Sequence, residues 1–368
     1  MDLRDSRNLI ETPDFSGTPN LEKLLLSGCT RLSKIHASLG YLKLLILLDL
    51  NGCKRLESFL RKISLESLEI FDLGGCSILK KFPKIVGDMS RLTKLFLNNT
   101  AIKNLPSSVK HLIGLIELDL SNCKNLSSLV NAICSMTSLK SLTLSGCPKL
   151  DQLPENLGNL QRLEKLHVNG TAIRGLPSSF LLLKNLLVLS LRKCPGLSTI
   201  QLNPIGIECS LSGLWSLVEL DLSYCYLPAI PDIFGWFPFL GVLHLTRNNF
   251  VHLPKSIIRL TKVIELHLNG CMHLRSLPEL PLSIQRIEAN GCTSLETITL
   301  TPGYYFHPFL RFINCIKLIE YHGYGDMLLT MLRQYFQVIS LSLSLSLSLS
   351  LSYEVLNIFV ILYISGGK

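Results

Sequence analysis

The sequence predicts an α/β solenoid, with a curved parallel β-sheet on the concave face and short helices, 3₁₀ turns and loops on the convex face. Three observations support this prediction. A nine-residue template rich in leucine recurs along the chain, its copies are almost evenly spaced, and prolines recur in the segments that connect them. Evenly repeated short units that share one core are the mark of a solenoid.

The template is LxxLxLxxC, and twelve segments match it. They begin at Leu21, Leu45, Leu68, Leu92, Leu115, Leu139, Leu163, Leu186, Leu217, Leu240, Val263 and Ile284. Most of these starts lie 23 or 24 residues apart. This period and leucine pattern are typical of leucine-rich repeats. We therefore predict a leucine-rich-repeat solenoid over residues 1–300, with about twelve full repeats and a partial one at its N-terminal end.

Each repeat is expected to supply one short strand and a return segment. Successive strands should stack in parallel about 4.7–4.9 Å apart, with the template leucines pointing into a shared core. A repeat of this length leaves little room for a long helix on the return side. Pairs such as Leu105-Pro106 and Leu176-Pro177 fit this expectation, because proline disfavours helix in the residue before it.

Two irregularities interrupt the regular array. Leu3 lies 23 residues before Leu26, so the chain begins inside a repeat. Since solenoids usually begin with a polar capping repeat, we expect a fragment of a longer protein or a shortened gene model. The interval from Leu186 to Leu217 is 31 residues, which predicts a surface loop that is either merely tolerated or used for binding.

The cysteines follow the repeat, because nine of the twelve occupy the ninth template position. Thr100, Thr171 and Asn248 occupy it in the other repeats, so the position needs a small side chain that hydrogen-bonds a turn. We predict a structural ladder, with Cys134, Cys209 and Cys315 lying off it. The ladder residues are Cys29, Cys53, Cys76, Cys123, Cys147, Cys194, Cys225, Asn248, Cys271 and Cys292.

Other roles for these thiols fit the sequence less well. A catalytic thiol needs a lowered pKa and solvent access, which nine equivalent buried positions do not supply. Zinc sites favour CxxC pairs, and the sequence contains none. Stacked repeats come close enough for disulfides, but a reducing compartment argues against them.

Several functional classes lack their motifs. The sequence has no GxxxxGK[ST], GxSxG or HExxH segment, so we expect no enzyme activity and no cofactor. Strand alternation places His267 and Cys271 on opposite faces, so no shared metal is expected. The formal net charge of +9 comes from scattered lysines and arginines, and no nucleic-acid partner is expected. The charged N-terminus lacks the apolar run of a signal peptide, which favours a cytoplasmic or nuclear location.

Binding is expected at outward positions of the strands and just beyond them. An extended surface that carries mixed charges and aromatic residues suits the recognition of a protein, whereas a solvated face without a ligand is the simpler alternative. The candidate partner-binding residues are Phe96, Asp119, Thr143, His167, Arg192, Lys193, Tyr224, His244, Arg247 and His267.

Specific phrases in the repeats resemble one family. The segments LNNTAIKNLPSSV (97–109), VNGTAIRGLPSSF (168–180) and NLIETPDFSGTPNLEKL (8–24) are similar to the repeats of plant TIR-NB-LRR disease-resistance proteins. Residues 301–337 resemble the start of the jelly-roll/Ig-like domain that follows those repeats, although they are too few to complete it. The TIR and nucleotide-binding motifs of that family do not occur in this chain, so the resemblance implies only its sensor part.

The last segment, residues 338–368, has a different character. Its alternating Ser-Leu tract is what a translated CT-dinucleotide repeat would encode, so we expect a low-complexity tail rather than a folded domain. A membrane segment is the alternative, but half of the alternating run is serine and the apolar stretch 355–364 is too short to span a bilayer.

The resemblance implies a non-catalytic module for protein recognition and autoinhibition in a plant intracellular immune receptor. Its partner would be a pathogen effector, a guarded host protein, or the nucleotide-binding domain of the same receptor. The first alternative is a generic repeat scaffold for signalling or for binding ubiquitin-ligase substrates. The second is a longer enzyme whose repeats direct an active site elsewhere in the parent chain.

Overall fold

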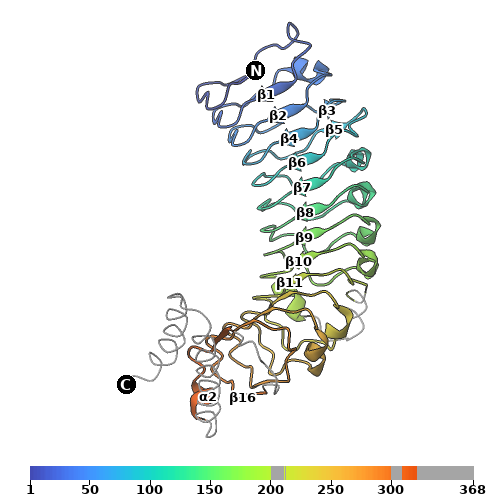
Figure 1. Ribbon diagram of the computed structural model, residues 1–368. Coiled ribbons are helices and arrows are strands. Elements are labelled where there is room, and N and C mark those ends of the chain that lie inside the picture. The colour runs from blue at the N-terminus through green and yellow to red at the C-terminus, as the bar shows by residue number, and fades with distance from the viewer. Residues whose placement is uncertain (200–210, 212, 300–308, 321–368) are drawn as a thin grey trace, which may run out of the picture. The chain divides into compact units, whose positions relative to one another are not determined.

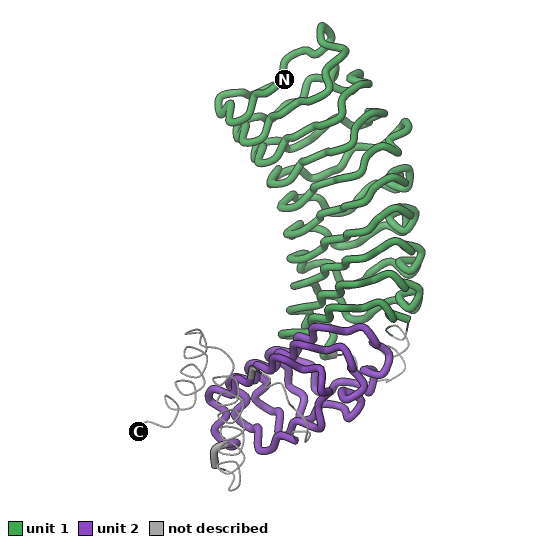
Figure 2. Tube along the Cα trace, viewed as in Figure 1, with its two compact units in different colours: residues 1–225 green, residues 226–368 purple. Residues whose placement is uncertain are grey.

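The computed structural model describes residues 1–199, 211, 213–299 and 309–320. These residues form two compact units, one over residues 1–225 and one over residues 226–368, and each is considered by itself (Figure 2). The tail at 338–368 and most of the segment 301–337 lie outside the described residues. Within the described residues, no helix is long and apolar enough to cross a membrane.

The first unit is built on a parallel sheet whose strands follow one another in chain order (Figure 1). Each strand takes the residues around the fourth template position. The strands are β1 (Lys23–Leu25), β2 (Leu47–Asp49), β4 (Ile70–Asp72), β6 (Lys94–Phe96), β7 (Glu117–Asp119), β8 (Ser141–Thr143), β9 (Lys165–His167), β10 (Val188–Ser190) and β11 (Glu219–Asp221). A second, two-stranded sheet pairs β3 (Lys62–Ile63) with β5 (Lys84–Ile85).

The second unit repeats this plan. Its parallel strands are β12 (Val242–His244), β13 (Glu265–His267), β15 (Arg286–Glu288) and β17 (Phe309–Arg311), and β14 (Ser276–Leu277) pairs with β16 (Thr297–Ile298). Strand β17 pairs in parallel with β15, Ile287 opposite Leu310. The repeat architecture therefore extends beyond residue 300, where we expected it to end, and α2 (Ile316–Glu320) follows it.

The return segments are short, as the repeat length predicts. They contain the 3₁₀ helices η1 (Ala37–Tyr41), η2 (Ser107–His111), η3 (Asn131–Ser135), η4 (Leu157–Asn159), η5 (Ser178–Leu182), η6 (Pro195–Thr199), η7 (Phe234–Trp236) and η8 (Lys255–Arg259). Pro106, Pro177 and Pro254 precede three of these helices in an extended conformation. Since proline fixes φ and has no N–H, it suits a position just before a helical turn. The predicted leucine-rich-repeat solenoid class is confirmed.

The core of each unit is a stack of template leucines. Leu95 and Leu97, for example, are fully buried, whereas Phe96 between them is half-buried on the other side of the strand. Complete burial of one leucine side chain contributes roughly 1.5–3 kcal/mol. Identical rows of leucines in register explain why neighbouring strands align without offset, because a slip by one residue would turn every leucine outward.

Candidate functional site

The ladder cysteines lie just beyond the strands and connect each repeat to the one before it. Each thiol donates a hydrogen bond to the carbonyl of the sixth template residue in the preceding repeat. Cys147 Sγ, for example, lies 3.2 Å from the carbonyl oxygen of Leu120, and Cys225 Sγ lies 3.1 Å from that of Leu191. The same contact is made by Cys29, Cys53, Cys76, Cys123, Cys194, Cys271 and Cys292.

The non-cysteine members of the ladder donate a hydrogen bond within their own repeat instead. Thr100 Oγ1 donates to the Leu97 carbonyl at 2.8 Å, and Thr171 Oγ1 donates to the Val168 carbonyl at the same distance. Asn248 Nδ2 donates to the Leu245 carbonyl, and its Oδ1 accepts the N–H of Leu227. These contacts explain why the position accepts three residue types: each is small and satisfies the buried turn.

Cys315 corrects one expectation. We placed it off the ladder, and residues 307–315 have histidine where the template begins with leucine. The structure places its fully buried Sγ 3.1 Å from the carbonyl oxygen of Ala289, the same contact that the other cysteines make. The spacing from Cys292 to Cys315 could have revealed this further repeat.

Burial decides the chemistry of these thiols. Burial raises the pKa of Cys76, Cys147 and Cys225 to about 12, because a thiolate loses its hydration there. Cys271 differs, since a hydrogen bond with Cys292 lowers its pKa and raises that of Cys292 to about 12. The side chain of Cys271 is nevertheless fully buried, so it lacks the access that a nucleophile needs.

The outward residues of the strands form one column within each unit. Phe96, Asp119, Thr143 and His167 end successive strands β6 to β9 in strict register, and all four are half-buried. In the second unit, His244 lies opposite His267. The structure therefore brings these predicted residues together in the order that the repeat implies.

Some carboxylates of this column are already engaged by their own turn. Asp119 Oδ1 accepts the N–H of Ser121 at 2.8 Å, and Asp72 makes the same contact with Gly74. Burial raises the pKa of Asp72, although its hydrogen bonds with Gly74 and Asn51 oppose that shift. An aspartate at this position therefore holds the turn that follows the strand.

Arg192, Lys193, Tyr224 and Arg247 lie outside the strands, in the turns that follow them. Lys193, Tyr224 and Arg247 have φ of 58°, 61° and 53°, in the left-handed region. Other repeats have glycine at this point, including Gly146 and Gly170. The four residues therefore belong to the edge where the strands end rather than to the strand column itself.

Two histidines lie side by side on the outward surface of the second unit. The rings of His244 and His267 stack with centroids 4.5 Å apart. His267 Nε2 lies 3.0 Å from Glu265 Oε2, and its Nδ1 lies 3.4 Å from Glu288 Oε2. Among the described residues, no group of three or more His, Cys, Asp or Glu side chains could hold a metal ion.

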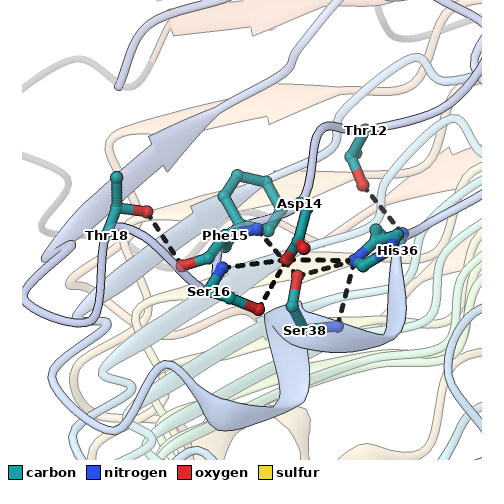
Figure 3. Close-up of polar contacts among 7 residues, drawn as sticks. All are labelled: Thr12, Asp14, Phe15, Ser16, Thr18, His36 and Ser38. Atoms are coloured by element: carbon teal, nitrogen blue, oxygen red, sulfur yellow. Dashed lines mark hydrogen bonds and ion pairs between the residues drawn. The ribbon is translucent and has the colours of Figure 1, made fainter.

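Sequence reasoning missed a polar cluster in the first unit (Figure 3). Asp14, His36 and Ser38 meet there, with Ser38 Oγ 2.7 Å and Asp14 Oδ1 3.6 Å from His36 Nδ1. Both contacts use the same ring nitrogen, whereas a catalytic triad uses one nitrogen for the nucleophile and the other for the carboxylate. Ser38 is also buried and accepts the N–H of Phe15, so the cluster fastens a turn.

The chain is similar to plant disease-resistance proteins. Residues 64–152 match the family described as disease resistance protein RPS4B-like, leucine-rich repeats, and residues 115–202 match a leucine-rich repeat region. The chain is 36% identical to TMV resistance protein N of Nicotiana glutinosa over 81% of its length, which is 26% of that protein. It is also 36% identical to disease resistance-like protein DSC1 of Arabidopsis thaliana, over 86% of the chain and 26% of that protein.

A solved structure supports the fold alone. A leucine-rich-repeat protein of Leptospira interrogans superposes with a TM-score of 0.51 at 24% identity, covering 82% of this chain and 83% of that one. The chain spans about a quarter of the length of the two plant proteins that it matches.

Proposed function

Because the repeats of this chain belong to the leucine-rich repeats of plant disease-resistance proteins, we propose that they recognise a protein and have no catalytic role. The partner is a pathogen effector or a host protein that the receptor guards. In a longer receptor the repeats also hold the other domains inactive until that partner binds. The proposal places this module in the cytoplasm or the nucleus.

The outward strand column carries this proposal. Phe96, Asp119, Thr143 and His167 present an aromatic ring, a carboxylate, a hydroxyl and an imidazole side by side on neighbouring strands. Such a mixed row gives a protein partner apolar contact and directional hydrogen bonds together. The buried ladder thiols and the single-nitrogen contacts of His36 offer no comparable support for catalysis.

Site-specific photo-crosslinking tests the proposal. A photo-reactive amino acid placed at Thr143 should form a covalent adduct with one effector or host protein in tissue exposed to the pathogen. The matched control is the same amino acid at Ser128, an exposed residue beyond the ladder in the preceding repeat. Adducts at Thr143 and not at Ser128 are expected, with the partner identified by mass spectrometry.

Two outcomes would contradict recognition through this face. One is equal adduct formation at both positions. The other is an adduct at Thr143 with ubiquitin-ligase subunits in healthy tissue, which would favour the scaffold alternative.

Autoinhibition is tested separately. A chimaera in which this chain replaces the corresponding repeats of TMV resistance protein N should show no defence response in healthy leaves. Point variants of the outward strand column, such as Phe96→Glu, should change the level of the defence response in healthy leaves. A chimaera that signals constantly would show that these repeats do not restrain the receptor.

A further inference from the structure

The turns after β10 and β11 contain two bulky residues in a backbone conformation that favours glycine. Lys193 and Tyr224 have φ of 58° and 61°, at the position that is Gly146 and Gly170 in the two repeats before them. A left-handed conformation costs a residue with a Cβ roughly 1–2 kcal/mol relative to the right-handed one. Strain of this kind at two consecutive repeats points to a function of the side chains.

The side chains of these turns gather in one cluster, Arg192, Lys193 and Tyr224, which we call the turn cluster. The guanidinium carbon of Arg192 lies 4.9 Å from the centroid of the Tyr224 ring, and Lys193 Nζ lies 5.7 Å from it. Two cations thus share one aromatic ring, which holds both long side chains at the edge of the sheet. The exposed Arg192 and Lys193 side chains remain open to solvent.

The two cations of the turn cluster form no ion pair with the described residues. The interactions of the described residues give the Arg192 guanidinium and the Lys193 ammonium no hydrogen bond and no ion pair beyond the ring contacts. Asp221 is the carboxylate of the same turn, but it is buried, and its Oδ1 accepts the N–H of Ser223 at 2.8 Å. Among the described residues, no carboxylate therefore forms an ion pair with either of these two exposed cations.

We propose that the turn cluster binds an acidic segment of a protein partner, with carboxylates placed against Arg192 and Lys193. Arginine and tyrosine are over-represented among the residues that contribute most to protein interfaces. A guanidinium held by an aromatic ring is pre-organised for a bidentate contact with a carboxylate. Single-stranded nucleic acid fits less well, because the Tyr224 ring already carries two cations and base stacking requires a free ring face. This inference rests on the proposed function, since it names the chemistry of the partner.

Fluorescence anisotropy with a labelled deca-glutamate peptide tests the proposal on the full 368-residue chain. The double variant Arg192→Glu/Lys193→Glu should weaken peptide binding about tenfold or more. The matched control is Lys110→Glu/Lys184→Glu, which changes the net charge equally at two exposed lysines, one in η2 and one just after η5. Equal weakening by the two double variants would show a general charge effect and overturn the proposal.

A second variant separates binding from folding. Lys193→Gly removes one cation and relieves the left-handed strain, so the midpoint of thermal unfolding should stay unchanged or rise while peptide binding weakens. A lower midpoint with unchanged binding would show that Lys193 has a structural role only, and would overturn the proposal.

A labelled deca-thymidine probes the nucleic-acid alternative. Tighter binding of this oligonucleotide than of the peptide, with loss in the Arg192→Glu/Lys193→Glu variant, would replace the acidic protein partner by a nucleic acid. The crosslinks at Thr143 do not depend on the turn cluster. Their presence together with unaltered peptide binding would leave protein recognition standing and remove only the turn-cluster proposal.

Discussion

Single residues in this protein are placed by the hydrogen bond that each can make at the end of a strand. A thiol at the ladder position reaches the carbonyl of the preceding repeat, as Cys147 reaches Leu120, whereas Thr100 returns to its own repeat. Some charged side chains are also held in place by hydrogen bonds. Glu288 Oε2 accepts the Asn269 Nδ2–H at 3.1 Å and lies beside His267.

Thiol labelling with a maleimide reagent tests the ladder at this scale. All ladder cysteines are buried, so labelling should be slow in the folded chain and fast after denaturation. Mass spectrometry of each labelled peptide gives the rates residue by residue. Rapid labelling of one ladder cysteine in the folded chain would reopen the possibility of a reactive thiol.

A pH-dependent effect is expected at Glu288. Burial alone would raise its pKa, but the Asn269 hydrogen bond and the charges of His267 and Arg311 lower it overall. A carboxylate with a lowered pKa in the folded state stabilises above its unfolded pKa of about 4.3, and the benefit is lost as pH falls through the folded pKa. Glu288→Gln should therefore cost about 1–2 kcal/mol of unfolding free energy at pH 7.

The measurement for Glu288 is urea unfolding across pH. The difference in unfolding free energy between the wild type and Glu288→Gln should shrink below about pH 4. Gln285→Glu offers a control, because residue 285 is an exposed neighbour just before β15. A difference that stays constant down to pH 3 would contradict the role of the carboxylate charge.

At the scale of elements, the backbones of neighbouring return segments approach each other closely. A Cβ built on Gly114 would lie 1.8 Å from the carbonyl oxygen of Ser90 in the preceding repeat. That contact is with backbone, so it cannot be relieved by turning a side chain. Glycine at this point allows the segment before β7 to approach its neighbour.

Gly114→Ala is therefore expected to destabilise the chain by roughly 1–3 kcal/mol, because the backbone of one repeat must move away from the next. Gly17→Ala is the matched control, since a Cβ there meets nothing within 4 Å. Chemical denaturation of both variants measures the difference. Equal stability of the two variants would show that neighbouring repeats can move apart at this contact without a cost in free energy.

At the scale of the whole molecule, each compact unit is a series of similar repeats, and each repeat contacts its neighbours in the sequence. In such an array the free energy of folding is approximately a sum over repeats and their interfaces. The sheet of the first unit shows this plainly, because each strand from β1 to β10 pairs with the one that follows it in the sheet (Figure 1).

Deletion of one complete repeat should consequently be tolerated. Removing residues 139–162 takes out one full period and joins equivalent positions, so β7 can pair with β9 in the same register. Circular dichroism should show a cooperative unfolding transition at a somewhat lower temperature. Removal of residues 139–150 alone takes out half a repeat, so the remaining repeats no longer align, and it should abolish that transition. Comparable folding of the two deletion variants would contradict the repeat model.

The sequence by itself determined the repeat, the inward leucines and the positions of the strands, because all of them depend on a local period that recurs along most of the chain. It also placed Phe96, Asp119, Thr143 and His167 in one column. The tertiary structure alone decided the features that do not follow the regular template. Cys315 joined the ladder despite a poor template match, because strand pairing with β15 fixes the register of its repeat.

The structure also decided which outward residues act together. Tyr224 follows Arg192 by 32 residues and Lys193 by 31, across the long interval, and all three were predicted as binding residues together with the strand column. Only the left-handed turns after β10 and β11 bring the two cations onto one ring. A periodic sequence specifies the neighbours of each repeat, whereas side-chain packing at the turns determines where its charges meet.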